Sequence, residues 1–369
     1  MSGLSATLVS HGFQPNYEKA FSNGLAKRGV AVTLIGSDRT LSDQLELGIR
    51  FLNLRGSQQT ERSRLEKAGN LLRYGARLFA FLAMQRPQNL HLIGTLVTGN
   101  PVLGPLECLC YSLLSKRFTL TVHNLLPHDR HSALNRLIYR LIYALPHKLV
   151  VHTKRMKAQL NTVWKVPAER IVVMEHGVDE LPATFQPWKP DPGNRIRLLL
   201  FGAVLRYKGI DTLLQALDHL NDQPITVDIV GLCRDAVYTE ELEQLIASAP
   251  ANHHIKWRQA YIAEDEVQGI FESADAVVLP YRHIDQSGVL LAAYRFGTPV
   301  IAFDVGAFAD YITDHTGILA PDTTPLGLAT GIRSFSKKMQ HFRRDKIRSY
   351  ARNYVWEKTV ESLLSNYCH

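Results

Sequence analysis

The sequence predicts an α/β protein with two doubly wound parallel sheets, one in each half, in domains that face each other across a cleft. A chain of 369 residues is too long for one ordinary hydrophobic core, so two domains of roughly 150–200 residues are expected. Apolar strand-like segments alternate with helical segments in both halves, as in parallel sheets covered by helices. Between the halves, residues 181–194 hold four prolines and a glycine, which is typical of a linker.

The N-terminal half, residues 1–180, opens with a βαβ unit. A strand at 4–10 is followed by a helix at 18–27 that stops near Gly29, and then by a strand at 30–35. Further strands are expected at 89–93, 118–122, 148–152 and 170–174. Helical segments are expected near 61–84, 102–116, 131–145 and 154–161.

The C-terminal half, residues 195–342, repeats this alternation. Strands are expected at 197–201, 226–230, 255–257, 276–280 and 300–303. Helices are expected at 209–220, 238–247, 265–273 and 288–296. Within the terminal segment, 343–369, one long helix is expected over 343–366.

The amino-acid composition is that of an ordinary globular protein. Hydrophobic residues at 46% and charged residues at 21% exclude a mainly disordered chain. No apolar stretch reaches the roughly 18–20 residues of a membrane span. The four cysteines, at unrelated spacings, predict neither a disulfide framework nor a zinc site, so a reducing, cytoplasmic compartment is expected.

The basic residues are concentrated in the N-terminal half. Residues 1–180 hold 23 Lys and Arg against 12 Asp and Glu, whereas the remainder holds 19 against 22. The excess favours a negatively charged partner, and a merely solvated basic surface is the alternative. Nucleic acid is not expected, because no recognised binding motif accompanies these residues.

Two helical segments of this half combine apolar and basic sides. In the first, near 61–84, apolar side chains lie on one side of the helix, and Arg62, Arg73 and Arg77 lie on another side. The apolar residues are Leu65, Ala68, Leu72, Ala76 and Phe79. The second, 134–145, mixes Arg136 and Arg140 with apolar residues. Both segments predict peripheral attachment to an anionic membrane surface on its cytoplasmic face, and core-facing helices with solvent-reaching arginines are the alternative.

Ligands of open parallel sheets bind beyond the carboxyl ends of the strands. In the C-terminal half, the strand at 197–201 is followed by Gly202 and by a loop with Arg206 and Lys208 just before a helix. Two cations at this place are suited to neutralise a diphosphate, and a solvent-exposed basic turn is the alternative.

The strand at 276–280 is followed by a polar loop that enters an apolar helix. Asp285 or Ser287 is suited to cap this helix, which leaves the first N–H groups directed at an anion. An ordinary cap without a ligand is the alternative. The residues of this candidate phosphate site are Asp285, Gln286, Ser287, Gly288, Val289 and Leu290.

Polar residues also follow the strand at 118–122 of the first half. His123, Asn124 and His128 are suited to bind a sugar hydroxyl or to stabilise charge, although a structural role for His128 is the alternative. No third ligand is suitably spaced for zinc, so no metal site is expected. The sequence has no Walker-A pattern, no G-x-S-x-G elbow, and no G-x-G-x-x-G after the first strand.

The motifs of the C-terminal half resemble the donor half of glycosyltransferase family 4. They are Gly202 with Arg206-Tyr-Lys-Gly209, Asp275-Ala-Val-Val-Leu-Pro280, Ser287-Gly-Val, and Phe296-Gly-Thr-Pro-Val-Ile-Ala. The resemblance covers residues 195–360 well and the first half more weakly. It implies a retaining enzyme of the GT-B fold, with two Rossmann-like domains and a terminal helix that crosses back to the first domain. The Gln-Ser-Gly loop resembles exopolysaccharide-type members.

The resemblance also implies roles for single residues. Arg206 and Lys208 would hold the donor diphosphate, and the helix start at Gly288–Leu290 would hold its distal phosphate. His123 would touch the transferred sugar. The loop at 12–17, with Gln14, Asn16 and Tyr17, would face the donor or the acceptor.

The sequence departs from the family pattern at three positions. Ile284 and Ala292 stand where two glutamates eight residues apart are usual, and Ala203 stands where an arginine is usual. Altered donor recognition is favoured over an inactive relative.

The expected function is therefore transfer of a hexose from a nucleotide diphosphate sugar to a glycan or lipid-linked acceptor in surface polysaccharide synthesis. Neither a metal nor another cofactor is expected, because cations and helix N–H groups would stabilise the leaving diphosphate. Two alternatives remain open. One is a nucleotide-binding protein of the same fold without transfer activity, and the other is an isomerase of the nucleotide-sugar 2-epimerase kind.

Overall fold

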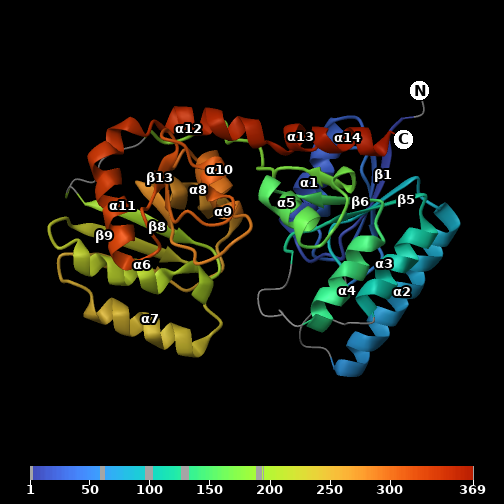
Figure 1. The fold of residues 1–369 in the computed structure, drawn as a ribbon, viewed down its shortest axis with the longest axis horizontal. Coiled ribbons are helices and arrows are strands. Elements are labelled where there is room, and N and C mark those ends of the chain that lie inside the picture. Colours follow the sequence, from blue (N-terminus) through green and yellow to red (C-terminus); the bar gives the residue numbers. More distant parts are fainter. Residues whose placement is uncertain are drawn as a thin grey trace. The chain divides into compact units, whose positions relative to one another are not determined.

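The structure is a computed structural model that describes residues 3–58, 63–95, 103–125, 133–187, 193 and 195–368. Its internal contacts divide the chain into two compact units. Unit 1 comprises Met1–Gly177 together with Val355–His369, and unit 2 comprises Val178–Tyr354. Each unit is built around one parallel sheet (Figure 1).

The described part of unit 1 contains a seven-stranded sheet in the order β3-β2-β1-β4-β5-β6-β7, with every pair parallel. The strand order reverses direction between β1 and β4, so the loops after these strands diverge and leave room for a ligand. The strands are β1 (Ser5–Val9), β2 (Ala31–Gly36), β3 (Arg50–Asn53), β4 (Asn89–Leu92), β5 (Arg117–Thr121), β6 (Lys148–Val151) and β7 (Ile171–Val173).

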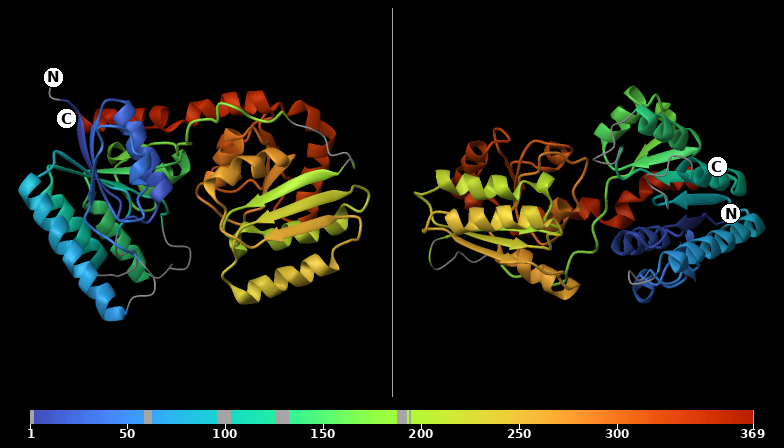
Figure 2. Two further views of the ribbon diagram at one scale, coloured as in Figure 1. Left: turned by 180° about the vertical axis from the view of Figure 1, so that it is seen from behind. Right: turned by 90° about the horizontal axis from the view of Figure 1, so that it is seen from below.

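Helices cover both faces of this sheet because alternate strand residues point to opposite sides. Val9 and Ile35 pack in one hydrophobic cluster, while their neighbours Leu8 and Leu34 pack in the other. Helices α2 (Arg64–Gln85), α3 (Leu103–Leu114), α4 (Ala133–Ala144) and α5 (Lys154–Thr162) contribute to the first cluster. Helices α1 (Pro15–Lys27), α13 (Trp356–Thr359) and α14 (Glu361–Tyr367) belong to the second cluster. Helices α2, α3 and α4 lie side by side (Figures 1 and 2).

The described part of unit 2 contains a six-stranded parallel sheet in the order β10-β9-β8-β11-β12-β13, which reverses between β8 and β11. Its strands are β8 (Ile196–Phe201), β9 (Ile225–Val230), β10 (His254–Arg258), β11 (Ala276–Leu279), β12 (Val300–Ala302) and β13 (Gly317–Leu319). Its helices are α6 (Ile210–Ala216), α7 (Ala236–Ser248), α8 (Glu264–Ser273), α9 (Gly288–Arg295), α10 (Phe308–Tyr311), α11 (Pro325–Lys338) and α12 (Arg344–Ala351).

Two doubly wound parallel sheets are thus confirmed, with differences in detail. The sequence prediction omitted β3, β13, α10 and α11. The single long helix expected over 343–366 is wrong, because the chain forms α12, α13 and α14 with a break before α13. Val355 has extended backbone angles, and the Tyr354 carbonyl accepts a bond from the Val178 N–H. None of the described helices is long and apolar enough to cross a bilayer.

Candidate functional site

A pocket of about 460 Å³ lies at the carboxyl ends of β1, β4 and β5 in unit 1. We call it the switch-point pocket because the strand order of the sheet reverses there. Three of the predicted residues line it together, namely Gln14, His123 and Asn124. The aromatic side chains of Phe13 and Tyr139 also contribute to its wall. The predicted His128 lies outside the described residues.

His123 is held as a neutral acceptor in this pocket. Its Nε2 donates a hydrogen bond of 2.8 Å to the Ile93 carbonyl, which leaves Nδ1 as an acceptor. Burial, with a smaller contribution from nearby His176, lowers the pKa of His123 to about 4. At neutral pH this ring is therefore suited to accept a bond from a hydroxyl group rather than to supply positive charge.

Asn16 and Tyr17 lie in the first turn of α1 rather than in a loop. Asn16 is exposed, whereas Tyr17 is buried with its ring edge-to-face against His123 at 4.9 Å. Trp356 packs against Tyr17 at the same centroid distance. Tyr17 is not among the lining residues of the pocket, so its contact with His123 supports the imidazole instead.

A buried network behind the pocket was not predicted from the sequence. His11 contacts the Tyr74 hydroxyl through Nδ1 at 2.6 Å and the Glu107 carboxylate through Nε2 at 3.1 Å. Its carbonyl accepts bonds from Arg55 and from Gln58, at 2.5 and 2.7 Å. The partners lie 44 to 96 positions away, so only the His11-Gly12 pair at the end of a strand could have signalled it.

The same network fixes an unusual turn. His11 and Gly12 both have positive φ angles, 59° and 70°. A Cβ at Gly12 would lie 1.9 Å from the Ser37 Oγ, so only glycine fits. Phe13 and Gln14 follow directly and are thereby positioned at the pocket.

In unit 2, Lys208 lies beside the turn after β8. A Cβ at Gly202 would be 3.3 Å from the Lys208 Nζ and 3.8 Å from Val289 at the start of α9. The ammonium also lies 5.7 Å from the centre of the Tyr281 ring. Three residues of the predicted donor site, Gly202, Lys208 and Val289, are therefore brought together.

The charge of Lys208 has no carboxylate to match it within the described part of the chain. Burial alone lowers the pKa of Lys208 to about 8. Lys208 is half-buried, and a partly desolvated cation without a carboxylate partner is costly, so this site is suited to an anionic ligand.

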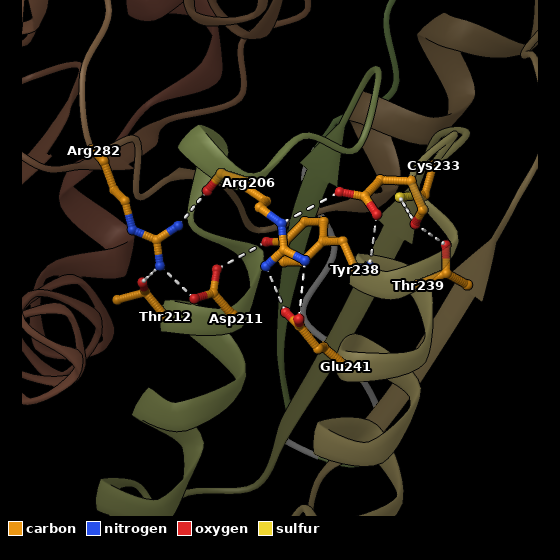
Figure 3. Close-up of polar contacts among 9 residues, drawn as sticks. Arg206, Asp211, Thr212, Cys233, Tyr238, Thr239, Glu241 and Arg282 are labelled. Carbon is orange, nitrogen blue, oxygen red and sulfur yellow. Dashed lines mark hydrogen bonds and ion pairs between the residues drawn. The ribbon is translucent and has the colours of Figure 1, made fainter. Parts of the chain in front are cut away.

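Within the described residues, Arg206, unlike Lys208, forms ion pairs with carboxylates, among them Glu241 (Figure 3). Its guanidinium binds both oxygens of Glu241 at 2.6 and 2.9 Å, and Asp235 at 3.3 Å. It also lies over the Tyr238 ring at 4.6 Å. The structure therefore does not bring the two predicted cations together, because carboxylates already match the charge of Arg206.

The backbone around Arg206 is held by a second arginine (Figure 3). Arg282 donates to the Arg206 carbonyl and forms an ion pair with Asp211, and the Tyr238 hydroxyl donates to Asp211 at 2.8 Å. This network fixes the short 3₁₀ turn Arg206–Lys208 and hence the position of Lys208.

The start of α9 lies close to the turn after β8. Ser287 is the N-cap residue, and its side chain makes no capping hydrogen bond. Gly288 is exposed and Val289 is half-buried, whereas the Leu290 side chain lies in the core. Asp285 and Gln286 are half-buried in the preceding loop. Because the Val289 side chain lies 3.8 Å from the position of a Cβ at Gly202, the first turn of α9 lies near Gly202, and helix starts of this kind suit an anion.

Comparison with protein families gives two matches that together cover most of the chain. Residues 16–180 match the model described as Glycosyltransferase Family 4, and residues 195–338 match the model described as Glycosyl transferases group 1.

Curated relatives are similar over part of their length. A GDP-mannose:glycolipid 4-beta-D-mannosyltransferase of Xanthomonas campestris pv. campestris is 28% identical over 233 residues, or 63% of this chain and 58% of that protein. A D-inositol 3-phosphate glycosyltransferase of Streptomyces bingchenggensis is 25% identical over 60% of this chain and 52% of that protein. The chain thus matches little more than half the length of these relatives.

Solved structures resemble the whole chain in fold. Sucrose-phosphate synthase from Thermosynechococcus elongatus has a TM-score of 0.75 at 17% identity, covering 99% of this chain and 98% of that one. HepE of Anabaena, in complex with UDP and glucose, has a TM-score of 0.70 at 14% identity, covering 98% and 100%.

Proposed function

Because the chain belongs to glycosyltransferase family 4, we propose that it transfers a hexose from a nucleotide diphosphate sugar to a glycan or lipid-linked acceptor. The proposal includes retention of the anomeric configuration, independence of metal and other cofactors, and a place in surface polysaccharide synthesis. The named relatives use a GDP-sugar or a phosphorylated acceptor, and HepE binds UDP-glucose, which supports this class of substrates.

One observation carries the proposal, namely the half-buried Lys208 ammonium that lies beside Gly202 and Val289 without a carboxylate partner in the described chain. In the proposed reaction, the bond between the anomeric carbon and the donor diphosphate breaks. Negative charge then develops on the departing diphosphate, which Lys208 and the first N–H groups of α9 stabilise.

The acceptor hydroxyl attacks the same face of the sugar from which the diphosphate departs. Its oxygen forms the new bond to the anomeric carbon, and its proton passes to the departing diphosphate, so no protein nucleophile is required. His123, as a neutral acceptor, orients a sugar hydroxyl. Lys208 supplies the positive charge that a divalent ion would otherwise provide. Arg206 holds the loop rather than the diphosphate.

The three candidate functions differ in what happens to the donor without an acceptor. We expect slow hydrolysis of one among UDP-, GDP- and ADP-hexoses, with free sugar of retained configuration followed by NMR. Tight binding without turnover would indicate the binding protein instead. A change of sugar configuration in a nucleotide-linked product would indicate the isomerase.

Unit 1 offers a surface for peripheral membrane attachment. Every exposed residue of α3 is a leucine, namely Leu103, Leu106, Leu109 and Leu113. The neighbouring α4 exposes Leu134, Leu137 and Leu141. We call these seven side chains the leucine face. Exposed apolar patches of this kind mark interaction surfaces.

Charge favours a lipid bilayer as the occupant of the leucine face. The exposed Arg136 and Arg140 lie on α4 next to its leucines, and α4 has no acidic residue. A second copy of the chain would place like charges opposite each other, whereas anionic headgroups would match them. The predicted residues Leu65 and Leu72 of α2 are exposed as well, while Phe79 packs partly in the core.

A further inference from the structure

A second pocket in unit 1, of about 220 Å³, is lined on two sides by arginines. The loop after the edge strand β3 contributes Arg55 between Leu54 and Gly56. Helix α2 contributes Arg73 and Arg77, together with Asn70 and Tyr74. No acidic residue lines this arginine pocket, so its positive charge is not matched from within its walls.

The three guanidinium groups also form no ion pair with a carboxylate anywhere in the described ranges. Arg73 contacts the amide oxygen of Asn70 at 3.4 Å within the described ranges. Arg55 donates to the His11 carbonyl and stacks over the Phe13 ring at 4.5 Å. Other exposed arginines do have carboxylate partners, as Arg206 has Glu241 and Arg258 has Glu266 in unit 2. Like charges gathered in a pocket repel one another unless an anion joins them.

The arginine pocket adjoins the switch-point pocket through a single pair of side chains. Phe13 lines the switch-point pocket, and its ring lies directly against the guanidinium of Arg55. A substrate with a sugar beside His123 and a phosphoryl group at the arginines would therefore span two neighbouring pockets. Arginine is the residue best suited to bind phosphate oxygens in pairs.

We propose that Arg55, Arg73 and Arg77 bind the diphosphate group of the acceptor, which makes the acceptor a diphosphate-linked glycan. This inference rests on the proposed function, because it names the acceptor class for the same transfer. The anion contacts the two α2 arginines from one side and Arg55 from the other.

The test is calorimetric titration of the full chain with farnesyl diphosphate and with inorganic pyrophosphate, in the presence of a saturating nucleoside diphosphate that fills the Lys208 site. We expect the double variant Arg73→Gln, Arg77→Gln to bind farnesyl diphosphate at least about tenfold more weakly, since two charge-assisted contacts are lost. Both side chains are exposed, so the variant should fold, which its thermal unfolding checks.

The matched control is Arg50→Gln, because Arg50 is an exposed arginine at the opposite end of β3. It should bind both probes as the wild type does. Equal binding by the double variant and the wild type, or an equal loss in the control, would overturn the proposal. Equal binding of farnesyl diphosphate and pyrophosphate would show that the arginines recognise the diphosphate group alone, and tighter binding of farnesyl diphosphate would show that the lipid chain adds a contact. Either outcome, if it depends on Arg73 and Arg77, supports the diphosphate site.

Failure of this inference is distinguishable from failure of the proposed function. If nucleoside diphosphates bind and the arginine variant still binds farnesyl diphosphate normally, only the acceptor site is wrong. If no nucleoside diphosphate binds while the arginine-dependent binding remains, the proposed function is wrong and the anion site stands.

Discussion

Lys208 shows how partial burial, without a carboxylate partner among the described residues, prepares a cation for an anion. Its ammonium has a pKa lowered to about 8, in contrast to Arg206, whose charge is matched by Glu241 and Asp235. The two cations are two positions apart in the sequence, and a shared role was predicted from their loop at a strand end and from the family resemblance. The groups that they contact lie 29 to 73 positions further along the chain, where sequence spacing gives no signal.

The lowered pKa makes nucleotide binding dependent on pH. In the free protein Lys208 is charged below about pH 8 and becomes neutral as the pH rises through that value. The dissociation constant of the bound nucleoside diphosphate should therefore increase between pH 7 and pH 9, by up to roughly tenfold per pH unit above the pKa. Fluorescence or calorimetric titration at several pH values measures this.

The control variant is Lys208→Arg, which stays charged throughout this range. Its affinity, even if weaker, should change little between pH 7 and pH 9. An identical pH profile for the wild type and this variant would assign the titration to another group.

At the scale of elements, apolar runs predicted most strands because parallel strands are buried on both faces. The missed strands β3 and β13 lie at the sheet edges, and β3 begins with Arg50 and ends with Asn53. These two strands are only three or four residues long and hold few apolar side chains, so their hydrophobicity does not distinguish them from loops. The helices α2 to α5 of unit 1 lie within the helical segments that the sequence predicted, give or take one residue at their ends. The sequence did not show which of their leucines are exposed and which lie in the core.

The leucine face predicts binding to anionic vesicles. Replacing Leu106, Leu109 and Leu113 by Gln should reduce binding at least about fivefold, since apolar area no longer enters the bilayer. These side chains are exposed, so thermal unfolding should change little. Sedimentation with vesicles of anionic lipid at low salt provides the measurement.

Leu326→Gln on α11 of unit 2 is the matched control, because Leu326 is exposed to a similar degree. It should leave vesicle binding unchanged. Unchanged binding by the triple variant would show that the leucine face does not bind the bilayer. Equal binding of the wild type to neutral and to anionic vesicles would exclude an electrostatic contribution of Arg136 and Arg140.

For the whole molecule, the C-terminal segment Val355–His369 completes the core of unit 1. Trp356 packs so closely that a Cβ at Gly177 would lie 2.2 Å from its ring, and one at Gly24 3.0 Å from its Cβ. The sequence predicted a segment that returns to the first half. It could not show that the chain breaks its helix at Val355 to place this tryptophan.

Trp356→Ala should therefore destabilise unit 1 by about 3–5 kcal/mol, the usual cost of a large core truncation. Hydrogen exchange should show faster exchange in α1 and in the strands of unit 1. The amides of β8, β9 and β11 in unit 2 should keep their protection, since Trp356 belongs to the hydrophobic core of unit 1. Equal loss in both units would show that the chain unfolds as one body.

The central claim is that a nucleoside diphosphate binds at Lys208 beside the start of α9. The most direct measurement is calorimetric titration of UDP, GDP and ADP into the wild type, Lys208→Met and Arg206→Gln. We predict that the wild type binds at least one of them, that Lys208→Met weakens this binding by at least about tenfold, and that Arg206→Gln changes it less than about threefold. Binding of none of the three nucleotides by the wild type, or equal binding by the wild type and Lys208→Met, would contradict the account.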